Sequence, residues 1–385
     1  MEVREKLYPL PLRVTVSRLE TFAACPFRFF LTYGLKLRER EIHRIDPAGL
    51  GQFYHEALKN FVVRLQEKGK DWGEMEEEEC WALMQGVIEE LAPRLQYHIF
   101  NLSARHRYLK SCLEKILARA LKVWHQHARR GSFRPWWVEA EFSPKGGPLP
   151  PLELQTPSGL ILSLEGRVDR IDGVEHRDKI YLRVIDYKSN PTDLDLVRIY
   201  HALSLQLPLY LAAAREGVRQ LRGKEVEAAG ILYLPIQTPL IKRKAPVTPQ
   251  EAENLRKEVL RARGLFLHDL EVLRLMDREL EKGDLLPIRV KKDGTLHSRS
   301  PVVERDKMKK MLDWACSQAR VLGEKILEGE VAPRPYRLGR EKPCDTCPYG
   351  SVCGLDPLLP GVEWRALEPL TPEEVWERLL QEGGG

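Results

Sequence analysis

Apolar residues recur at the helical spacing of three and four along six stretches of the chain. Residues 50–68 show this most clearly, because one face carries Phe53, Tyr54, Ala57, Leu58, Phe61 and Val62. In the stretch that begins at residue 17, Ser17 and Glu20, three residues later, fit a capping box at the start of a helix. The pattern predicts helices over residues 17–31, 50–68, 75–130 (with a connection near Pro93), 193–215, 249–282 and 304–328.

Shorter segments alternate apolar and polar residues or are continuously apolar, as strands do. They predict strands over residues 136–142, 160–171, 179–186 and 228–235, with a turn near Asp172 and Gly173 between the second and third. Asp293 and Gly294 indicate a hairpin between residues 287–290 and 295–299. Strands bracketed by long helices predict an α/β fold, a mixed sheet core with a helical insertion or flank.

Composition adds few constraints. The 385 residues are 43% hydrophobic and 30% charged, as in an ordinary globular protein, and the net charge of +5 permits a nucleic-acid partner without requiring one. The first ten residues contain no signal peptide, and no run of about 18 apolar residues occurs. We therefore expect a cytoplasmic protein without a membrane span.

The second and third predicted strands each deliver an acidic residue, Asp169 and Asp186, and Lys188 follows two positions later. Alternation along a strand places Asp186 and Lys188 on one face, while the carbonyl of Tyr187 stays available. Carboxylate and carbonyl oxygens are the ligands of Mg²⁺, which activates water and polarises phosphoryl oxygens. The alternative is an exposed strand that carries a charge pair, since an acid-x-lysine pattern is short and common.

Further polar residues allow two interpretations each. His55 lies beside the apolar stripe of its helix, where it is either structural or a metal ligand. Glu139 and Glu141 share one face of a strand, so either could add an acid to a metal site, or both are solvated. Gln206 and Tyr210 lie four apart on a helix, so they either contact substrate or bond internally.

The cysteines suggest a second metal site. Cys344 and Cys347 form a CxxC pair, and Cys353 follows six residues later. Cys25 is a candidate fourth ligand because it precedes a proline, as Cys347 does, although Cys316 would serve by count alone. Four thiolates bind either zinc or an iron–sulfur cluster. With Cys25 as a ligand, the metal would join the two ends of the chain.

Several motifs run in one order across nearly the whole chain: Ser17 to Phe30, Gly51 to Leu58, Gly166 to Asp172, Ile185 to Ser189, Gln206 to Tyr210, the Asp293–Gly294 hairpin and the Cys344 segment. In these motifs the chain resembles the AddB/RecB-type nucleases of the PD-(D/E)xK superfamily. The resemblance is closest to the C-terminal nuclease domain of the AddB subunit of bacterial helicase–nucleases.

The resemblance implies a restriction-endonuclease-like core and two inorganic cofactors. Cys25, Cys344, Cys347 and Cys353 would bind a [4Fe–4S] cluster that staples the terminal segments together. His55, Asp169, Asp186 and the carbonyl of Tyr187 would bind Mg²⁺ or Mn²⁺, and Lys188 would be catalytic. Gln206 and Tyr210 match a Gln-x-x-x-Tyr motif that is expected near the DNA strand.

The implied function is a Mg²⁺-dependent DNA exonuclease that acts on single strands or frayed ends in double-strand-break repair. Residues 1–385 would form one nuclease domain, divided into a cluster-binding segment (1–48), a helical part (49–132), the nuclease core (133–240), a helical and hairpin part (241–332) and a second cluster-binding segment (333–385). AddB has a long helicase-like region before this domain, so this chain would be a split gene product, a truncated copy or a stand-alone exonuclease, with or without an AddA-like partner. The alternatives are a non-catalytic DNA-end-binding or scaffold module and a CRISPR-adaptation exonuclease.

Overall fold

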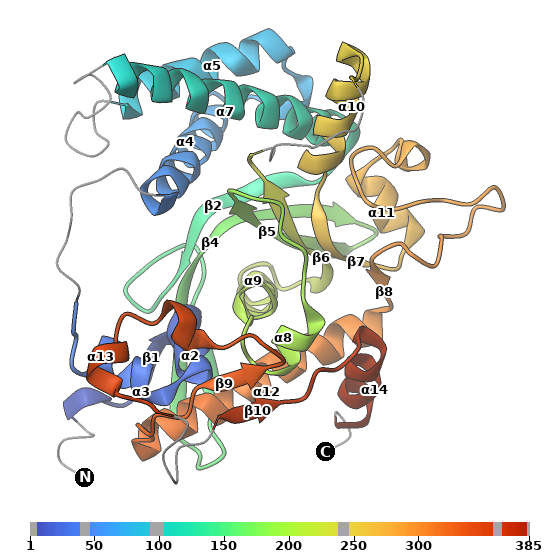
Figure 1. Cartoon of the computed structure of the whole chain (residues 1–385). Coiled ribbons are helices and arrows are strands. Elements are labelled where there is room, and N and C mark those ends of the chain that lie inside the picture. Colours follow the sequence, from blue (N-terminus) through green and yellow to red (C-terminus); the bar gives the residue numbers. More distant parts are fainter. Residues whose placement is uncertain (1–5, 39–46, 93–103, 238–245, 357–363, 383–385) are drawn as a thin grey trace.

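The computed structural model describes residues 6–38, 47–92, 104–237, 246–356 and 364–382. Its centre is a mixed sheet in which strands follow the order β1-β4-β5-β6-β7-β8, with β2 and β3 also paired to β4 (Figure 1). The strands are β1 (Leu12–Thr15), β2 (Arg134–Phe142), β3 (Leu152–Gln155), β4 (Ile161–His176), β5 (Lys179–Lys188), β6 (Glu225–Pro235), β7 (Arg263–Leu267) and β8 (Val302–Val303). The prediction of a mixed α/β fold is confirmed.

The long strand β4 organises the sheet. Its first part pairs with β1 and β3, and its second part pairs antiparallel with β2 and β5. The next strand, β6, is parallel to β5, so the chain must cross over between them. The crossover contains helices α8 (Leu196–Tyr200) and α9 (Gln206–Arg222), and α9 lies against one face of the sheet (Figure 1).

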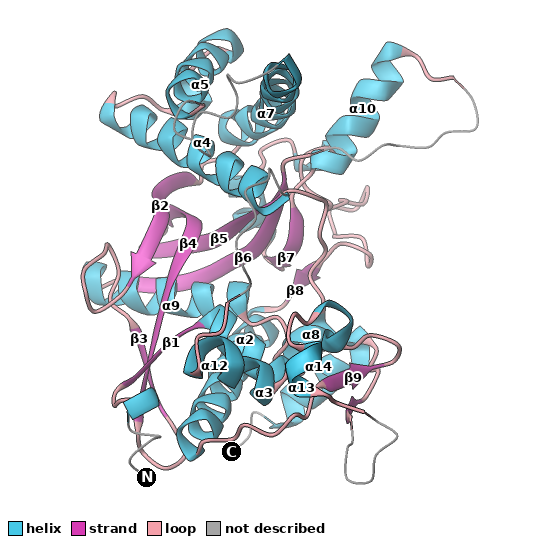
Figure 2. Ribbon diagram, turned by 60° about the vertical axis from the view of Figure 1, so that its left-hand side comes forward, coloured by secondary structure: helices cyan, strands magenta, loops and turns pink. Residues whose placement is uncertain are grey.

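Each face of the sheet has its own hydrophobic core, because successive strand residues point to opposite sides. Val184 belongs to one core and Ile185 to the other. The first core is covered by α2 (Val16–Ala24), α3 (Pro26–Phe29), α9, α12 (Arg305–Glu328) and α14 (Pro372–Glu382). The second is covered by α4 (Pro47–Glu67), α5 (Glu77–Leu91), α7 (Ala104–Arg130), α10 (Pro249–Leu260) and α11 (Leu270–Met276). Figure 2 shows α4, α5 and α7 on one side of the sheet and α2, α9 and α12 on the other.

A segment near the N-terminus and a segment near the C-terminus lie side by side. A C-terminal segment contains β9 (Tyr336–Leu338), paired with β10 (Arg365–Leu367), and the short helix α13 (Gly350–Cys353). The Tyr349 hydroxyl lies 3.2 Å from Thr32 Oγ1 and donates to the carbonyl of Leu37 at 3.0 Å. These contacts fix the C-terminal segment next to α3, as Figure 1 shows.

Three predicted helices are broken in the structure, and two of them lie beyond residue 190. The stretch 249–282 ends as a helix at Leu260 and continues as β7, whose central residues Leu265 and Phe266 are buried in opposite cores. The stretch 193–215 divides into α8 and α9, and the Asp195 side chain caps α8 by accepting from the Arg198 N–H at 3.0 Å. The predicted hairpin at Asp293 and Gly294 is present in a short form. The Lys291 N–H donates to the Thr295 carbonyl and the His297 N–H to the Arg289 carbonyl, both at 2.8 Å, and Val290 and Leu296 form an antiparallel bridge.

The predicted turn at Asp172 and Gly173 is wrong, because β4 continues to His176. The reversal occurs at Arg177 and Asp178, whose φ angles of 49° and 63° fit a tight hairpin turn. The predicted capping box is also wrong. Thr15 is the N-cap of α2, with no side-chain cap bond.

The first predicted helix is interrupted at Cys25, which is extended with φ −164°. The predicted connection near Pro93 lies outside the described residues. Among the helices that are described, none combines the length and the apolar composition needed to cross a membrane.

Candidate active site

The antiparallel pair β4–β5 brings the two predicted acids together. Arg170 pairs with Ile185, so the same register carried one residue further sets Asp169 opposite Asp186. The Tyr187 N–H donates to Asp169 Oδ2 at 2.9 Å, which fixes the orientation of that carboxylate. The strand alternation expected of Asp186 and Lys188 is observed, with Lys188 Nζ 2.6 Å from Asp186 Oδ2.

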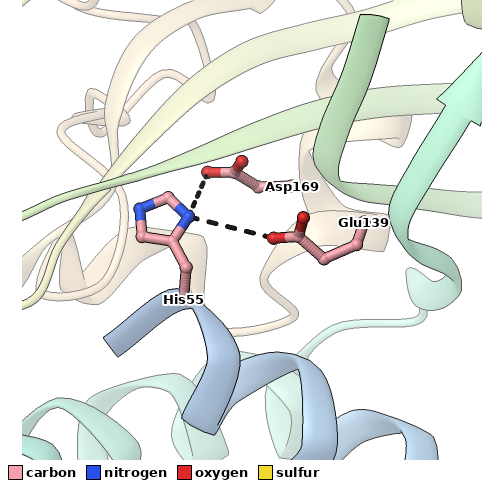
Figure 3. Close-up of side chains that lie close together, drawn as sticks. All are labelled: His55, Glu139 and Asp169. Atoms are coloured by element: carbon pink, nitrogen blue, oxygen red, sulfur yellow. Dashed lines mark ion pairs between the residues drawn. The ribbon is translucent and has the colours of Figure 1, made fainter. Parts of the chain in front are cut away.

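His55 reaches this point from helix α4 (Figure 3). Its Nδ1 lies 3.2 Å from Asp169 Oδ2 and 3.9 Å from Glu139 Oε1. Its Nε2 lies 3.0 Å from the carbonyl oxygen of Tyr187. Because a carbonyl can only accept, Nε2 is the donor, and in the neutral ring Nδ1 then holds the lone pair that faces the carboxylates.

The sequence left open whether Glu139 or Glu141 adds an acid to the site, and the structure places Glu139 there. Glu139 sits on β2 between residues paired with Arg170 and Val168, and so faces Asp169, whereas Glu141 is exposed. The φ of Glu139 is +48°, a conformation that costs a non-glycine residue of order 1–3 kcal/mol and is concentrated at functional sites. The exposed Arg167 guanidinium holds the second oxygen of Glu139 at 2.6 Å.

Asp186 is positioned by the helix that follows β5. Gln206, the first residue of α9, donates from Nε2 to Asp186 Oδ1 at 2.9 Å. The Glu20 carboxylate accepts from the backbone N–H groups of Leu205 and Gln206 at 2.7 and 3.0 Å, thereby anchoring the start of α9. This role of Glu20 was not anticipated from the sequence, where its spacing from Ser17 suggested a cap instead.

Tyr210, one turn after Gln206, also packs inside the protein. Its ring meets Phe142 edge-on with centroids 5.5 Å apart, and the backbone N–H of Arg167 bonds its phenol oxygen. A Cβ at Gly166 would come within 3.1 Å of Tyr210 and 2.6 Å of Phe142, so glycine is required for this approach. Gln206 and Tyr210 thus have the internal contacts that were one of their two interpretations, and their contact with substrate stays a prediction.

The site concentrates negative charge in a partly buried place. Burial and the neighbouring Asp169 raise the pKa of Asp186 to about 6, although Lys188 and His55 oppose the shift. Burial and Asp169 likewise raise the pKa of Glu139. Burial disfavours the charged form of His55, but its bond to Asp169 and the nearby carboxylates outweigh burial and raise the pKa. Such mutual repulsion is what a bound cation relieves.

The donor atoms fit a divalent cation. His55, Glu139 and Asp169 each offer a ligand atom, and these atoms lie within 4.8 Å of one another. Two ligands of one ion at ~2.1 Å lie about 3 to 4 Å apart, which matches the two His55 distances. Among the described residues, no donor meets the buried Asp186 Oδ2 in hydrogen-bond geometry, despite the nearby Lys188 Nζ. The site therefore offers several oxygen donors, and one of them, the buried Asp186 Oδ2, lacks a hydrogen-bond donor within the described residues.

A buried charged network lies beneath Tyr187. The fully buried Asp172 accepts two bonds from Arg170, at 2.5 and 2.9 Å, and two from Arg183, at 2.8 and 2.9 Å. Arg170 also donates to the Tyr187 hydroxyl at 3.3 Å. Because the N–H and C=O of Tyr187 contact Asp169 and His55, this network positions the backbone that orients these two side chains.

The four predicted cluster ligands line one cavity of about 300 Å³ between α3 and the C-terminal segment. Cys25, Cys344, Cys347 and Cys353 all contribute, whereas Cys316 lines a different cavity, with Arg215 and Asp313. Burial and the three neighbouring thiols raise the pKa of Cys344 to about 11. Holding four thiolates there would therefore require positive charge.

Comparisons with known proteins identify the family of this chain. The sequence model of the PD-(D/E)XK nuclease superfamily matches residues 13–354. The chain is 49% identical over 377 residues to the AddB subunit of the ATP-dependent helicase/deoxyribonuclease of Moorella thermoacetica, covering 98% of this chain and 33% of that protein. It is 40% identical over 384 residues to the protein of the same name from Symbiobacterium thermophilum, covering 100% and 33%. The chain thus spans about a third of the length of these curated relatives. With a superfamily match over most of its length and this set of residues at the β4–β5 pair, the chain belongs to the PD-(D/E)XK nuclease superfamily.

Proposed function

We propose that residues 1–385 form a metal-dependent nuclease domain that hydrolyses DNA phosphodiester bonds. The observation that carries the proposal is the convergence of Asp169, Asp186 and Lys188 with His55 and Glu139 at one end of the β4–β5 pair. The succession β4, β5, α9 and β6 supports the restriction-endonuclease-like core that the family resemblance implies.

Each side chain has a distinct role in this proposal. His55, Glu139, Asp169 and Asp186 would hold Mg²⁺ or Mn²⁺, and the carbonyl of Tyr187 either joins them or orients His55 through its bond to Nε2. A bound ion of this kind polarises a phosphoryl oxygen and lowers the pKa of water. Lys188, with its ammonium beside Asp186, orients the attacking water or stabilises the charge that develops on the phosphate.

The names of the relatives support DNA as the substrate. Those proteins are named as subunits of an ATP-dependent helicase/deoxyribonuclease. We propose that this domain is an exonuclease that processes DNA ends in double-strand-break repair, together with an AddA-like helicase–nuclease subunit.

We also propose that Cys25, Cys344, Cys347 and Cys353 bind a [4Fe–4S] cluster. Zinc bound by four thiolates at ~2.3 Å would draw the sulfur atoms to about 3.8 Å from one another. All four cysteines line the same cavity of about 300 Å³, and a cavity of this size leaves room for an inorganic group larger than a single ion.

Digestion of DNA labelled at the 5′ or the 3′ end tests the function. Single-stranded and double-stranded substrates are incubated with Mg²⁺, with Mn²⁺ or with a chelator. Cleavage that requires the divalent ion and starts at ends is the expected result. Metal-independent cleavage, or DNA binding without cleavage under all conditions, would instead favour a contaminant or a non-catalytic end-binding module.

A further inference from the structure

A further hollow lies at the β7–β8 edge of the sheet that carries the acidic site. Its volume is about 800 Å³, and β7, β8, the loop before β8, α8 and α14 all contribute to its walls. Figure 2 shows β8 directly above α8 and α14. The residues whose chemistry matters here are Arg261, Arg263, Arg289, Arg299, His297 and Trp376.

The sheet connects this hollow to the acidic site. Asp186 is in register with Tyr233 on β6, and Tyr233 is in register with Arg263 on β7. Residues in register share a face, and adjacent strands are ~4.8 Å apart, so Arg263 lies about 10 Å from Asp186. Lys188 Nζ lies over the Tyr233 ring at 5.5 Å, between the two. A row of side chains therefore runs from the acids to the arginines.

The cations form the floor of the hollow and the acids its rim. The side chains of Arg261 and Arg263 are 24% and 29% exposed, whereas their partners Glu258 and Asp193 are 64% and 78% exposed. Arg263 Nε is buried without a hydrogen-bond partner among the described residues. Burial, together with Arg263 and Arg289, lowers the pKa of Arg261. The guanidinium groups of Arg261, Arg263 and Arg289 thus lie near one another, and one buried nitrogen, Arg263 Nε, has no acceptor within the described part of the chain.

Two further arginines are open to solvent at this hollow. Arg289 and Arg299 are exposed, and neither has a carboxylate partner in the described portion of the chain. Trp376 offers an aromatic surface in the same walls. Unpaired guanidinium groups next to an aromatic ring are the combination that binds the phosphates and stacks the bases of single-stranded nucleic acid.

We propose that this hollow is a binding subsite for the sugar–phosphate backbone of a single DNA strand whose scissile phosphate lies at Asp186. The inference rests on the proposed nuclease function and adds the path of the substrate. Because the hollow begins about 10 Å from Asp186, a strand reaches it only beyond the nucleotides that flank the cleaved bond. Short oligonucleotides would therefore miss the subsite and long ones would fill it.

The double variant Arg289→Glu/Arg299→Glu tests the proposal, beside a matched control, Lys68→Glu/Lys115→Glu, which makes the same charge change at exposed positions on other elements. Cleavage of a dinucleotide, which is too short to reach the hollow, and of single strands of about thirty nucleotides is measured with Mg²⁺. Binding of the long strand is measured separately by fluorescence anisotropy, in chelator, over a range of salt concentrations. The variant Arg289→Lys/Arg299→Lys keeps the charge.

The glutamate variant is expected to raise KM for the long strand at least about tenfold, with kcat and short-strand cleavage unchanged. Loss of two phosphate contacts should also flatten the slope of log affinity against log salt by about 1.4, at ~0.7 per contact. The lysine variant should keep the slope, and the surface control should match the wild type. An unchanged slope, an equal effect on both lengths, or equal competition by duplex DNA would overturn the subsite. If the wild type cleaves nothing, the proposed function fails, and the salt slope still decides the subsite by itself.

Discussion

Replacing Asp172 with asparagine should destabilise the whole protein, although the residue touches neither solvent nor metal. Asp172 is 0% exposed and accepts four bonds from Arg170 and Arg183. Burial alone would raise its pKa, but the two guanidinium groups outweigh burial and hold the pKa below its usual value. The native carboxylate is therefore charged, and its removal leaves two buried cations without an anion.

Breaking a buried ion pair by removing one partner costs about 3–5 kcal/mol. Asparagine keeps one acceptor oxygen, which retains some of the four bonds, so about 3 kcal/mol is the reasonable expectation. A domain with ~5–15 kcal/mol of total stability would lose a large fraction of it. The effect should reach the active site, because Arg170 also bonds the Tyr187 hydroxyl.

Urea unfolding followed by circular dichroism measures the loss, and the Mg²⁺ concentration needed for half-maximal cleavage measures the effect on the site. The control is Glu216→Gln, which breaks the exposed pair with Arg219 and should change stability by less than about 1 kcal/mol. A loss at Asp172 no larger than in this control would refute the view that the network supports the site.

Other predictions concern single positions. His127 is buried with a pKa lowered to about 3, so the folded protein should lose about 1.7 kcal/mol of stability between pH 6.5 and pH 5 as the unfolded chain takes up the proton. Urea unfolding of His127→Asn should lack that loss, and the same pH dependence in this variant would disprove the prediction. Cys25→Ser should lower bound iron after anaerobic purification while Cys316→Ser keeps it, whereas a colourless, zinc-containing, active wild type would rule out the cluster. Glu139→Gln should raise the Mg²⁺ requirement at least about tenfold, and an equal effect of Glu141→Gln would argue against a specific role.

The central features of the site could be predicted because they depend on local spacing. Alternation along a strand places Asp186 and Lys188 on one face whatever surrounds them. His55 and Glu139 could be named only as candidates, because their position beside Asp169 depends on how α4 and β2 pack on the sheet. The left-handed backbone of Glu139 is a product of that docking and has no sequence signature.

The errors have similar physical causes. The segment of β7 lies between helix-forming stretches. Pairing with β6 and β8, together with burial on both faces, makes Leu265 and Phe266 a strand. Asp172 and Gly173 have turn chemistry, but the buried guanidinium partners of Asp172 keep the strand extended. Glu20 has the spacing of a capping residue for its own helix. In the structure it instead accepts from the Leu205 N–H at the start of α9, 185 residues away in sequence.

The central claim is that Asp186 and Lys188 perform the chemistry. The direct test is single-turnover cleavage of end-labelled DNA at saturating Mg²⁺ by Asp186→Asn and Lys188→Met, with Lys224→Met as the control at an exposed lysine that pairs with Glu175. Both site variants should lose about 10²–10⁴-fold in cleavage rate, with unchanged circular dichroism and unchanged activity of the control. Folded site variants that cleave within about twofold of the wild type would contradict the claim.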